Sequence, residues 1–271
     1  IVWKKNHHKY RNLFTVLKEI RREKFDAVIN FQRFFSSGFI TAFSKASIRA
    51  GYSNNPMSLF FNRKVRHQLN GLHETERNLA LAKKCFPDLQ LMKPVIAVLK
   101  PDDSQKLTFT EQKYITIFPG SLWPTKQLPK ESWIEFMQKI PVGLKVIIAG
   151  SMDDRSQGED ILAARPESTM NLCGKSSILE SAWLMKNATM NFTNDSAPTH
   201  VASAVNAPVT TVFCSTVPDF GFTPLSDESH IIEYQGKLSC RPCGIHGHKT
   251  CPEKHFDCGH KIEISQLTEL I

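Results

Sequence analysis

The stretch TNDSAPTHVASAVNAPVTTVF (residues 193–213) joins two apolar runs through a polar turn and a helical segment. The flanking runs are short and bounded by Asn and Pro, which is typical of strands buried on both faces. The segment from Pro198 to Val205 has the length of a short helix. Strand, helix and strand at this spacing predict a βαβ unit on a parallel sheet.

The same alternation extends over most of the chain. A polar segment with Pro101, residues 99–113, interrupts it and indicates a linker. We therefore expect an α/β fold of two doubly wound, Rossmann-like domains facing a cleft, residues 1–108 and 109–271. The predicted strands are 25–32, 114–120, 145–151, 189–194 and 209–215, and the predicted helices are 10–22, 130–140, 153–164, 177–187 and 198–205.

The amino-acid composition limits which classes of protein this chain can belong to. The 271 residues are 41% hydrophobic and 22% charged, as in soluble globular proteins, and no apolar run approaches the ~20 residues of a membrane helix. The net charge of +8 favours an anionic partner: nucleotide phosphates, nucleic acid or an acidic membrane surface. Cys85, Cys173 and Cys214 lie singly in apolar contexts, which predicts core positions and a reduced, cytosolic setting.

The polar turn within the opening stretch has the features of an anion site. Ligands of open α/β sheets bind at the carboxyl ends of strands. Asp195 or Ser196 can cap the following helix, Pro198 suits its first turn, and its free N–H groups attract anions. His200 falls in the same turn. The alternative is ordinary capping, with His200 as a packing residue.

A second strand end, FPGSLWPTKQLPKESW (residues 118–133), likewise combines a turn after a strand with the start of a helix, as an anion site does. Gly120 and Ser121 form a tight turn after the strand, and Lys126 precedes a helix that starts near Lys130. A lysine here can act as a point charge on a phosphate, although a solvated loop lysine is the simpler interpretation. Two such strand ends in one domain indicate that the ligand is a nucleotide diphosphate.

These blocks together resemble a known family. With LSCRPCGIHGHKTCPEKHFDCGHKI (residues 238–262) and the upstream FDAVINFQ and HETERNLALA, the chain resembles the ADP-heptose lipopolysaccharide heptosyltransferases, glycosyltransferase family 9. The resemblance implies the GT-B arrangement and an inverting transfer of heptose from ADP-heptose to a lipopolysaccharide inner-core acceptor. It also implies that catalysis requires no metal cofactor.

The resemblance implies donor-binding roles at matching positions. Ala197 stands where the family signature Asp-Thr/Ser-Gly-x-x-His has glycine, and its Cβ can limit backbone approach to a phosphate. An acidic residue toward the ribose is expected after IIAGS, at Asp153 or Asp154. The expected donor-binding residues are Ser121, Lys126, Asp154, Asp195, Ser196, Ala197 and His200.

The start of the chain departs from the family. The family begins with a strand and a Gly-Asp turn whose aspartate, the resemblance implies, deprotonates the acceptor hydroxyl. Nothing before Phe25 resembles this turn, and the chain begins at Ile1. We therefore expect the first domain to be incomplete, with no catalytic base in this chain, so that it binds ADP weakly and transfers no sugar.

Four cysteines crowd into the tail segment 238–260. Their spacing, Cys240-x2-Cys243-x7-Cys251-x6-Cys258, is typical of a structural zinc site, with free thiols as the alternative.

The expected partners are an ADP-sugar and an anionic lipopolysaccharide core at the inner-membrane surface. We expect a cytoplasmic protein that is peripheral at that membrane, has no transmembrane segment and does not bind nucleic acid. One alternative keeps the GT-B fold with another nucleotide sugar or acceptor. The other is a zinc-containing nucleic-acid-binding protein that uses the basic surface.

Overall fold

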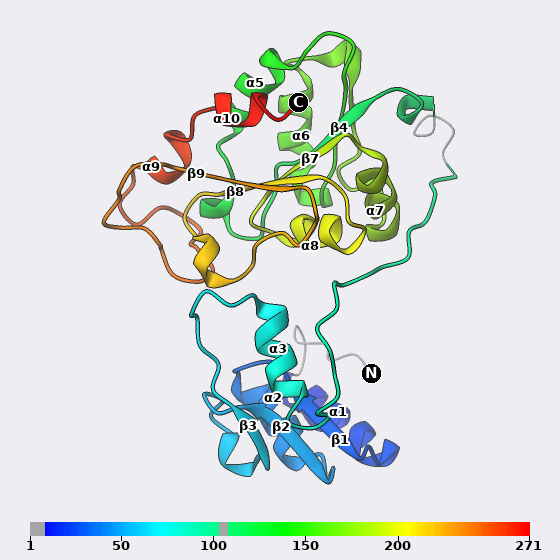
Figure 1. Cartoon of the computed structure of the whole chain (residues 1–271), viewed down its shortest axis with the longest axis vertical. Helices are drawn as coiled ribbons and strands as arrows, with labels where there is room; N and C mark the ends of the chain where they lie inside the picture. The colour runs from blue at the N-terminus through cyan, green and yellow to red at the C-terminus, as the bar shows by residue number, and fades with distance from the viewer. Residues whose placement is uncertain (1–8, 103–107) are drawn as a thin grey trace. The chain divides into compact units, whose positions relative to one another are not determined.

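The computed structural model describes residues 9–102 and 108–271, which form two compact units (Figure 1). The division falls between Met92 and Lys93, earlier than the boundary after residue 108 that the polar segment predicts. The reason is that the segment after Met92 binds the second unit: the Ile96 N–H donates to the Ala204 carbonyl and the Leu99 N–H to the Leu179 carbonyl, each at 3.2 Å. The first residues of the chain and part of the predicted linker lie outside the described residues.

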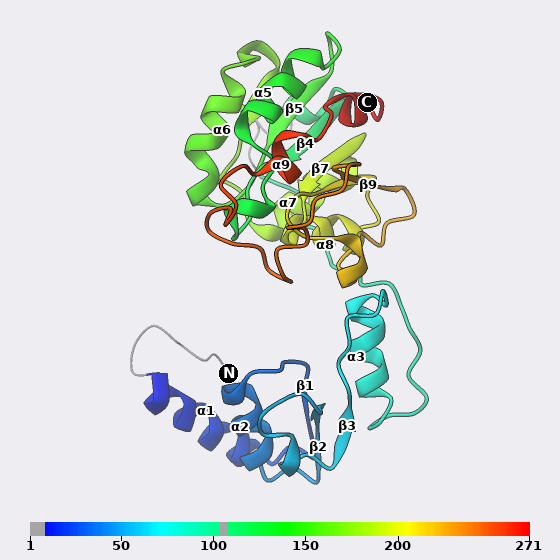
Figure 2. The same cartoon turned by 90° about the vertical axis from the view of Figure 1, so that its left-hand side faces the viewer.

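The first unit contains a parallel sheet with the described strands in the order β1-β2-β3. Helix α2 packs against β1, β2 and α1, and α3 packs against β2 and β3 (Figure 2). Ala50, Tyr52 and Leu81 form its buried core. The elements are α1 (Lys9–Glu23), β1 (Ala27–Asn30), α2 (Phe35–Phe43), β2 (Ile48–Tyr52), the 3-10 turn η1 (Ser58–Phe60), β3 (Arg63–Val65) and α3 (Glu74–Ala82).

Within the described residues, the sheet of the second unit has six parallel strands in the order β6-β5-β4-β7-β8-β9. Successive strands move outward from β4 on one side and then outward from β7 on the other, so the order reverses between β4 and β7. This is the doubly wound topology that the sequence predicts. The strands are β4 (Tyr114–Phe118), β5 (Lys145–Ile148), β6 (Thr169–Asn171), β7 (Met190–Asn194), β8 (Val209–Phe213) and β9 (Ser229–Glu233).

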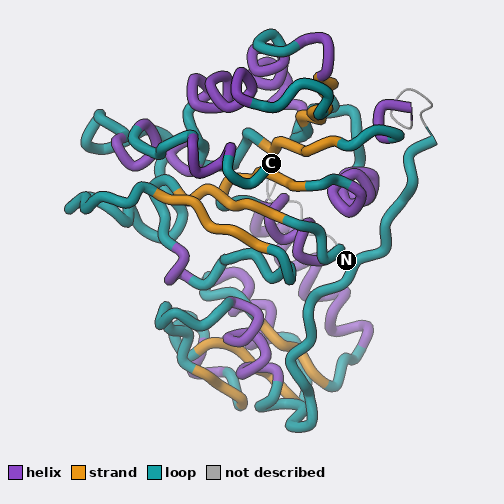
Figure 3. The backbone as a smooth tube through the Cα atoms, turned by 45° about the horizontal axis from the view of Figure 1, so that its top comes forward, coloured by secondary structure: helices purple, strands orange, loops and turns teal. Residues whose placement is uncertain are grey.

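Helices cover both faces of this sheet (Figure 3). One face carries α5, α6 and the short α10, and the other carries α7 and α8, which pack against each other. The helices and 3-10 turns are η2 (Pro124–Lys126), α5 (Lys130–Lys139), η3 (Met152–Asp154), α6 (Arg155–Leu162), η4 (Pro166–Ser168), α7 (Ile178–Asn187), α8 (Ala197–Ala204), η5 (Pro218–Phe220), α9 (Asp257–His260) and α10 (Ser265–Thr268).

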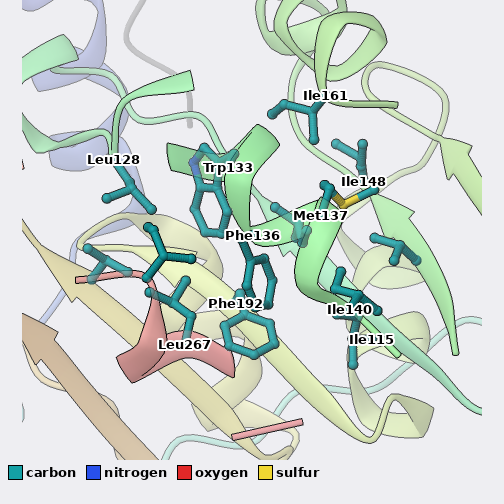
Figure 4. Close-up of a cluster of buried hydrophobic side chains, with 14 of the residues drawn as sticks. Ile115, Leu128, Trp133, Phe136, Met137, Ile140, Ile148, Ile161, Phe192 and Leu267 are labelled. Carbon is teal, nitrogen blue, oxygen red and sulfur yellow. The ribbon is translucent and has the colours of Figure 1, made fainter. Parts of the chain in front are cut away.

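Helix α5 anchors the main core of the second unit (Figure 4). Its buried residues Trp133, Phe136 and Met137 recur at the spacing of one helix face. The Phe136 ring lies 4.8 Å from that of Phe192 on β7, centroid to centroid. This packing holds α5, and therefore the loop that precedes it, against the strand that leads to Asp195.

The structure confirms every predicted strand and helix in type, with shorter strands than predicted. Four of the five end earlier than predicted, at Asn30, Phe118, Ile148 and Phe213, because the chain turns away from the sheet at its carboxyl edge, whereas β7 ends at Asn194 as predicted. Among the described helices and strands, the sequence did not predict α2, α3, α9, α10, β2, β3, β6 or β9. Strands β3 and β6 have three residues each, too few for a periodic pattern, and β9 has an exposed residue beside a buried one, as an edge strand does.

Candidate functional site

The two predicted ligand-binding strand ends meet at the point where the sheet order reverses. Strands β4 and β7 are hydrogen-bonded neighbours, with Phe118 opposite Thr193. Gly120 therefore follows β4, and Asp195 follows β7, at the same edge of the sheet. This is where open α/β sheets bind ligands.

Lys126 and Asp195 form an ion pair at this edge. The Lys126 Nζ lies 2.6 Å from the Asp195 Oδ2, and the two side chains are 13% and 6% exposed. The Thr216 hydroxyl, in the loop after β8, donates to the same carboxylate oxygen at 2.7 Å. Of the two predicted caps of the next helix, Asp195 does not serve, because its carboxylate is turned to Lys126 and Thr216.

Asn194 fixes the loop that carries Lys126. Its side-chain amide donates to the Pro119 carbonyl at 2.7 Å, and its Oδ1 accepts from the Leu128 N–H at 2.8 Å. Asn194 is fully buried, so both of its functional groups need these partners. One side chain of β7 thus holds both ends of the loop that leads from β4 to α5.

Helix α8 begins beside the ion pair. Ser196 occupies the N-cap position but makes no side-chain capping bond, because its hydroxyl lies 3.3 Å from the Asn194 carbonyl. Ser196 therefore does not cap the helix through its side chain as predicted. Pro198 lies in the first turn, as predicted, and Ala197 and His200 are exposed there. Ala197 has a helical backbone, so its conformation does not require the glycine of the family signature.

Asp154 lies in η3, which follows the neighbouring strand β5. Its Oδ2 accepts from both the backbone N–H and the hydroxyl of Ser151, each at 2.7 Å. Its carboxylate packs so closely on Gly120 that a Cβ there would lie 2.0 Å from Oδ1. Asp153 is exposed, whereas Asp154 is half-buried against the turn that leads to the Lys126 loop.

Ser121 lies in that same turn. Its backbone carbonyl accepts from the Gln127 side chain at 2.8 Å, which closes the loop around Lys126. The structure therefore brings the predicted residues after β4, β5 and β7 to one edge of the sheet.

The four C-terminal cysteines lie apart from this ion pair in the chain. The Cys240 Sγ is 3.8 Å from the His255 Nε2, and the Cys243 thiol donates to the Cys240 carbonyl at 3.2 Å. Burial raises the pKa of the Cys258 thiol to about 12. In residues 9–102 and 108–271, no three His, Cys, Asp or Glu side chains form a group that could hold a metal ion. The structural zinc site stays a prediction.

The single cysteines largely follow the sequence prediction. Cys173 and Cys214 are buried in the second unit, whereas Cys85 is only partly buried in the first. Burial raises the pKa of all three thiols, to about 12 for Cys173.

Sequence reasoning missed the residues that hold the site together. Thr216, Asn194 and Thr125 are buried polar side chains next to Lys126 or Asp195. The sequence does show one sign of their role: each is a polar residue at or just beyond the end of a strand or loop, where an apolar residue would otherwise be expected. Their partners lie far away in sequence, so the pattern alone does not identify the contacts.

Comparison with known proteins identifies the family. Residues 13–256 match the family model described as glycosyltransferase family 9 (heptosyltransferase). The chain belongs to this family. It is therefore a glycosyltransferase by descent, and the site at the β4–β7 edge lies within the matched residues.

Relatives of this family 9 glycosyltransferase carry consistent names. Lipooligosaccharide heptosyltransferase 2 of Haemophilus influenzae is 30% identical over 237 residues, which are 80% of this chain and 68% of that protein. Lipopolysaccharide heptosyltransferase 2 of Escherichia coli K12 is 32% identical over 129 residues, 45% of this chain and 37% of that protein.

Solved structures share the fold. E. coli ADP-heptose lps heptosyltransferase II matches with a TM-score of 0.72 at 22% identity, over 97% of this chain and 80% of that one. E. coli heptosyltransferase WaaC with ADP matches with a TM-score of 0.62 at 18% identity, over 84% of this chain and 72% of that one. The α/β fold with parallel sheets is thus that of the heptosyltransferases.

Within residues 9–102 and 108–271, no helix combines the length and the apolar character that crossing a bilayer requires.

Proposed function

We propose that this chain provides the donor site for heptose transfer from ADP-heptose to a lipopolysaccharide inner-core acceptor, a transfer with inversion at the anomeric carbon and without a catalytic metal. The observation that carries the proposal is the Lys126–Asp195–Thr216 cluster at the reversal point of a doubly wound sheet. Family membership and the names of the relatives support the choice of heptose. The structural neighbour bound to ADP supports the choice of nucleotide.

Lys126 is proposed to bind the donor diphosphate. Its ammonium group has three N–H donors, and the contact with Asp195 uses one of them. The remaining donors can reach phosphate oxygens while Asp195 keeps the lysine side chain in place. Because the pair is nearly excluded from water, its charge interactions are weakened less by solvent than those of a surface pair.

The start of α8 is proposed to complete the phosphate site. The exposed Ala197 and His200 lie in its first turn, where backbone N–H groups and the helix dipole favour negative charge. Ser121 and Ser196 flank the same strand ends. Donors already held in position stabilise the charge that develops on ADP as the sugar leaves.

Asp154 is proposed to lie near the donor ribose. Its Oδ2 is held by Ser151, and its Oδ1 faces Gly120 at the turn after β4. A fixed carboxylate can accept hydrogen bonds from ribose hydroxyl groups, as acidic residues do in other doubly wound nucleotide sites.

The proposed acceptor lies at the inner-membrane surface, which this chain approaches from the cytoplasm without spanning it. The net charge of +8 supports attraction to an anionic glycolipid surface.

Calorimetric binding of ADP, UDP and GDP tests the proposed donor. We expect ADP to bind, ADP-heptose to compete with it, and UDP and GDP to bind much more weakly. A preference for UDP or GDP would favour a GT-B enzyme with another nucleotide sugar. Binding of RNA with no binding of any nucleoside diphosphate would favour the nucleic-acid-binding alternative and contradict the proposal.

A further inference from the structure

The cysteine-rich segment packs on the loops that form the candidate site. The Cys243 N–H donates to the Ser215 carbonyl at 2.9 Å, just beyond the end of β8. The His248 N–H donates to the Thr125 hydroxyl at 2.7 Å, and the Thr125 N–H donates back to the His248 carbonyl at 3.2 Å. Thr125 immediately precedes Lys126, so this segment is bonded to the loop that carries the lysine.

Arg241 of the same segment holds the loop that carries Thr216. Its guanidinium donates to the carbonyls of Cys214 and Thr216, each at 2.7 Å, and to Glu233 at 2.6 Å. The Arg241 side chain is 11% exposed, so its fork of N–H groups is committed to these partners. Thr216 in turn donates to Asp195.

The backbone of Gly247 lies so close to the Lys126 loop that there is little room for a side chain. A Cβ at this position would lie 2.8 Å from the Thr125 Oγ1, 2.9 Å from the Ser215 Oγ and 3.1 Å from the Lys126 Cγ. Its φ of +73° also lies in the left-handed region that favours glycine. Gly244 has a similar φ of +82°, but a Cβ there would meet nothing within 4 Å.

We propose that Arg241, Cys243, Gly247 and His248, here called the brace, position the Lys126–Asp195 pair for the donor diphosphate. In this proposal Gly247 is a positioning residue that acts through Lys126, and Arg241 is one that acts through Thr216 and Asp195. The proposal rests on the proposed function, because it assigns the pair to a diphosphate. It gives the C-terminal segment a role in donor binding that does not depend on bound metal.

The physical reason is the flexibility of lysine. A lysine side chain has ~2 kcal/mol of rotamer entropy, so an unsupported ammonium group samples many positions. The brace packs against the Lys126 stem on one side, and Asp195 holds the Nζ. A methyl group at position 247 forces the Thr125 and Ser215 hydroxyls to shift and crowds the Lys126 Cγ at 3.1 Å. We therefore expect the loop that carries Lys126 to move and the lysine to separate from Asp195.

Two alanine variants separate this contact from backbone strain. Gly247→Ala adds both the strain of positive φ and the contact with the Lys126 loop, whereas Gly244→Ala adds only the strain. We expect Gly247→Ala to weaken ADP binding by about tenfold, equivalent to ~1.4 kcal/mol, with unchanged adenosine binding. Gly244→Ala keeps the affinity of the original protein for ADP.

Chemical labelling tests the position of Lys126 without any nucleotide. Acetylation by acetic anhydride, measured by mass spectrometry, is expected to be slow at Lys126 in the original protein because the amine is paired and nearly buried. It becomes faster in Gly247→Ala but not in Gly244→Ala, while Lys130 reacts equally in all three. Equal labelling of Lys126 in the two variants overturns the brace, whether or not the chain binds ADP.

A double-mutant cycle distinguishes positioning from general destabilisation. If Gly247 acts through Lys126, Gly247→Ala has no further effect on ADP affinity in a Lys126→Ala background. An undiminished tenfold loss in that background overturns the proposal. Should Gly247→Ala fail to fold, Arg241→Lys replaces it. We expect loss of the guanidinium fork to weaken the binding of ADP but not that of adenosine. Equal losses of affinity for both ligands overturn the proposal. Failure of the original protein to bind ADP contradicts the proposed function alone, since the labelling comparison still tests whether the brace positions Lys126.

Discussion

Lys126 depends on side chains that come from distant parts of the chain. Its partner Asp195 follows β7, the hydroxyl that supports Asp195 belongs to Thr216, and the loop itself is held by Asn194. Burying a lysine and an aspartate in this way costs desolvation energy, which their mutual attraction must offset. A pair kept at that cost is better explained by ligand binding than by stability.

Lys126→Ala tests this interpretation directly. Loss of a charged hydrogen bond to a partly desolvated diphosphate costs about 1.5–3 kcal/mol. We expect the ADP affinity to fall roughly ten- to a hundredfold and the adenosine affinity to stay the same, measured by calorimetry.

Lys130→Ala is the matched control for this substitution. Lys130 lies four residues further along, and its 2.8 Å ion pair with Asp160 is solvent-exposed. We expect it to bind ADP as the original protein does. An equal loss of ADP affinity in both variants would mean that Lys126 contributes only general positive charge.

His67 of the first unit predicts a pH dependence of stability. Burial lowers its pKa below 6.5, and the nearby Arg33 and Arg77 lower it further, although the contact of its Nε2 with Glu74 at 3.3 Å opposes this. The unfolded chain therefore binds a proton more readily than the folded one, and stability falls as the pH drops below about 6.5. Thermal unfolding between pH 7.5 and pH 5 measures this effect, and His67→Gln should flatten the curve. An identical slope in the variant would assign the effect to other groups.

At the scale of elements, close approach of α6 to β6 depends on Gly158. A Cβ at this position would lie 2.8 Å from both the Nδ2 and the Oδ1 of Asn171. Asn171 cannot easily move, because it donates to the Arg155 carbonyl at 3.2 Å and accepts from the Cys173 N–H at 3.0 Å. A small residue in a helix interior thus permits the helix to cover the edge of the sheet.

Gly158→Ala is therefore expected to destabilise the second unit. The crowding costs about 1–3 kcal/mol, and because two hydrogen bonds hold Asn171 in place we expect a cost above the roughly 1 kcal/mol that alanine contributes over glycine in a helix. Urea unfolding measures the difference. Ser156→Ala, on the exposed side of the same helix, is the control and should leave the midpoint nearly unchanged. A more stable Gly158→Ala variant would show that Asn171 moves aside at little cost.

At the scale of the whole molecule, the proposed donor-binding residues all belong to the second unit. This unit has its own core around Trp133, Phe136 and Phe192, and its sheet is covered on both faces. A domain with its own hydrophobic core can fold alone. The extended segment from Lys93 belongs to it as well, through the bonds of Ile96 and Leu99.

Residues 93–271 are therefore expected to fold by themselves and to bind ADP with the affinity of the whole chain. Circular dichroism and a cooperative urea transition report folding, and calorimetry reports binding. A version that starts at residue 109 removes the bonds of Ile96 and Leu99 and is expected to unfold at lower urea concentration. Folding without ADP binding in the 93–271 piece would place a required donor contact in the first unit.

The sequence by itself determined the α/β class, the central strands and helices, and the two strand ends that carry Lys126 and Asp195. It could do so because hydrophobic periodicity and turn residues are local properties, and the helices that cover the strands follow them directly in the chain. The motif blocks likewise predicted the family, which comparison then confirmed. The short strands and the unit boundary after Met92 needed the structure, since both depend on contacts between residues far apart.

Only the tertiary structure decided how the site is held. The sequence indicated that Asp195 or Ser196 would cap α8. Folding instead places Lys126 and Thr216 within reach of Asp195, and a full positive charge outcompetes a helix terminus for a carboxylate. The packing of residues 241–248 joins His248 to Thr125, 123 positions away in the sequence, and Cys243 to Ser215 on a different loop. No local pattern encodes such a contact, because it exists only after the sheet has brought the carboxyl ends of its strands together.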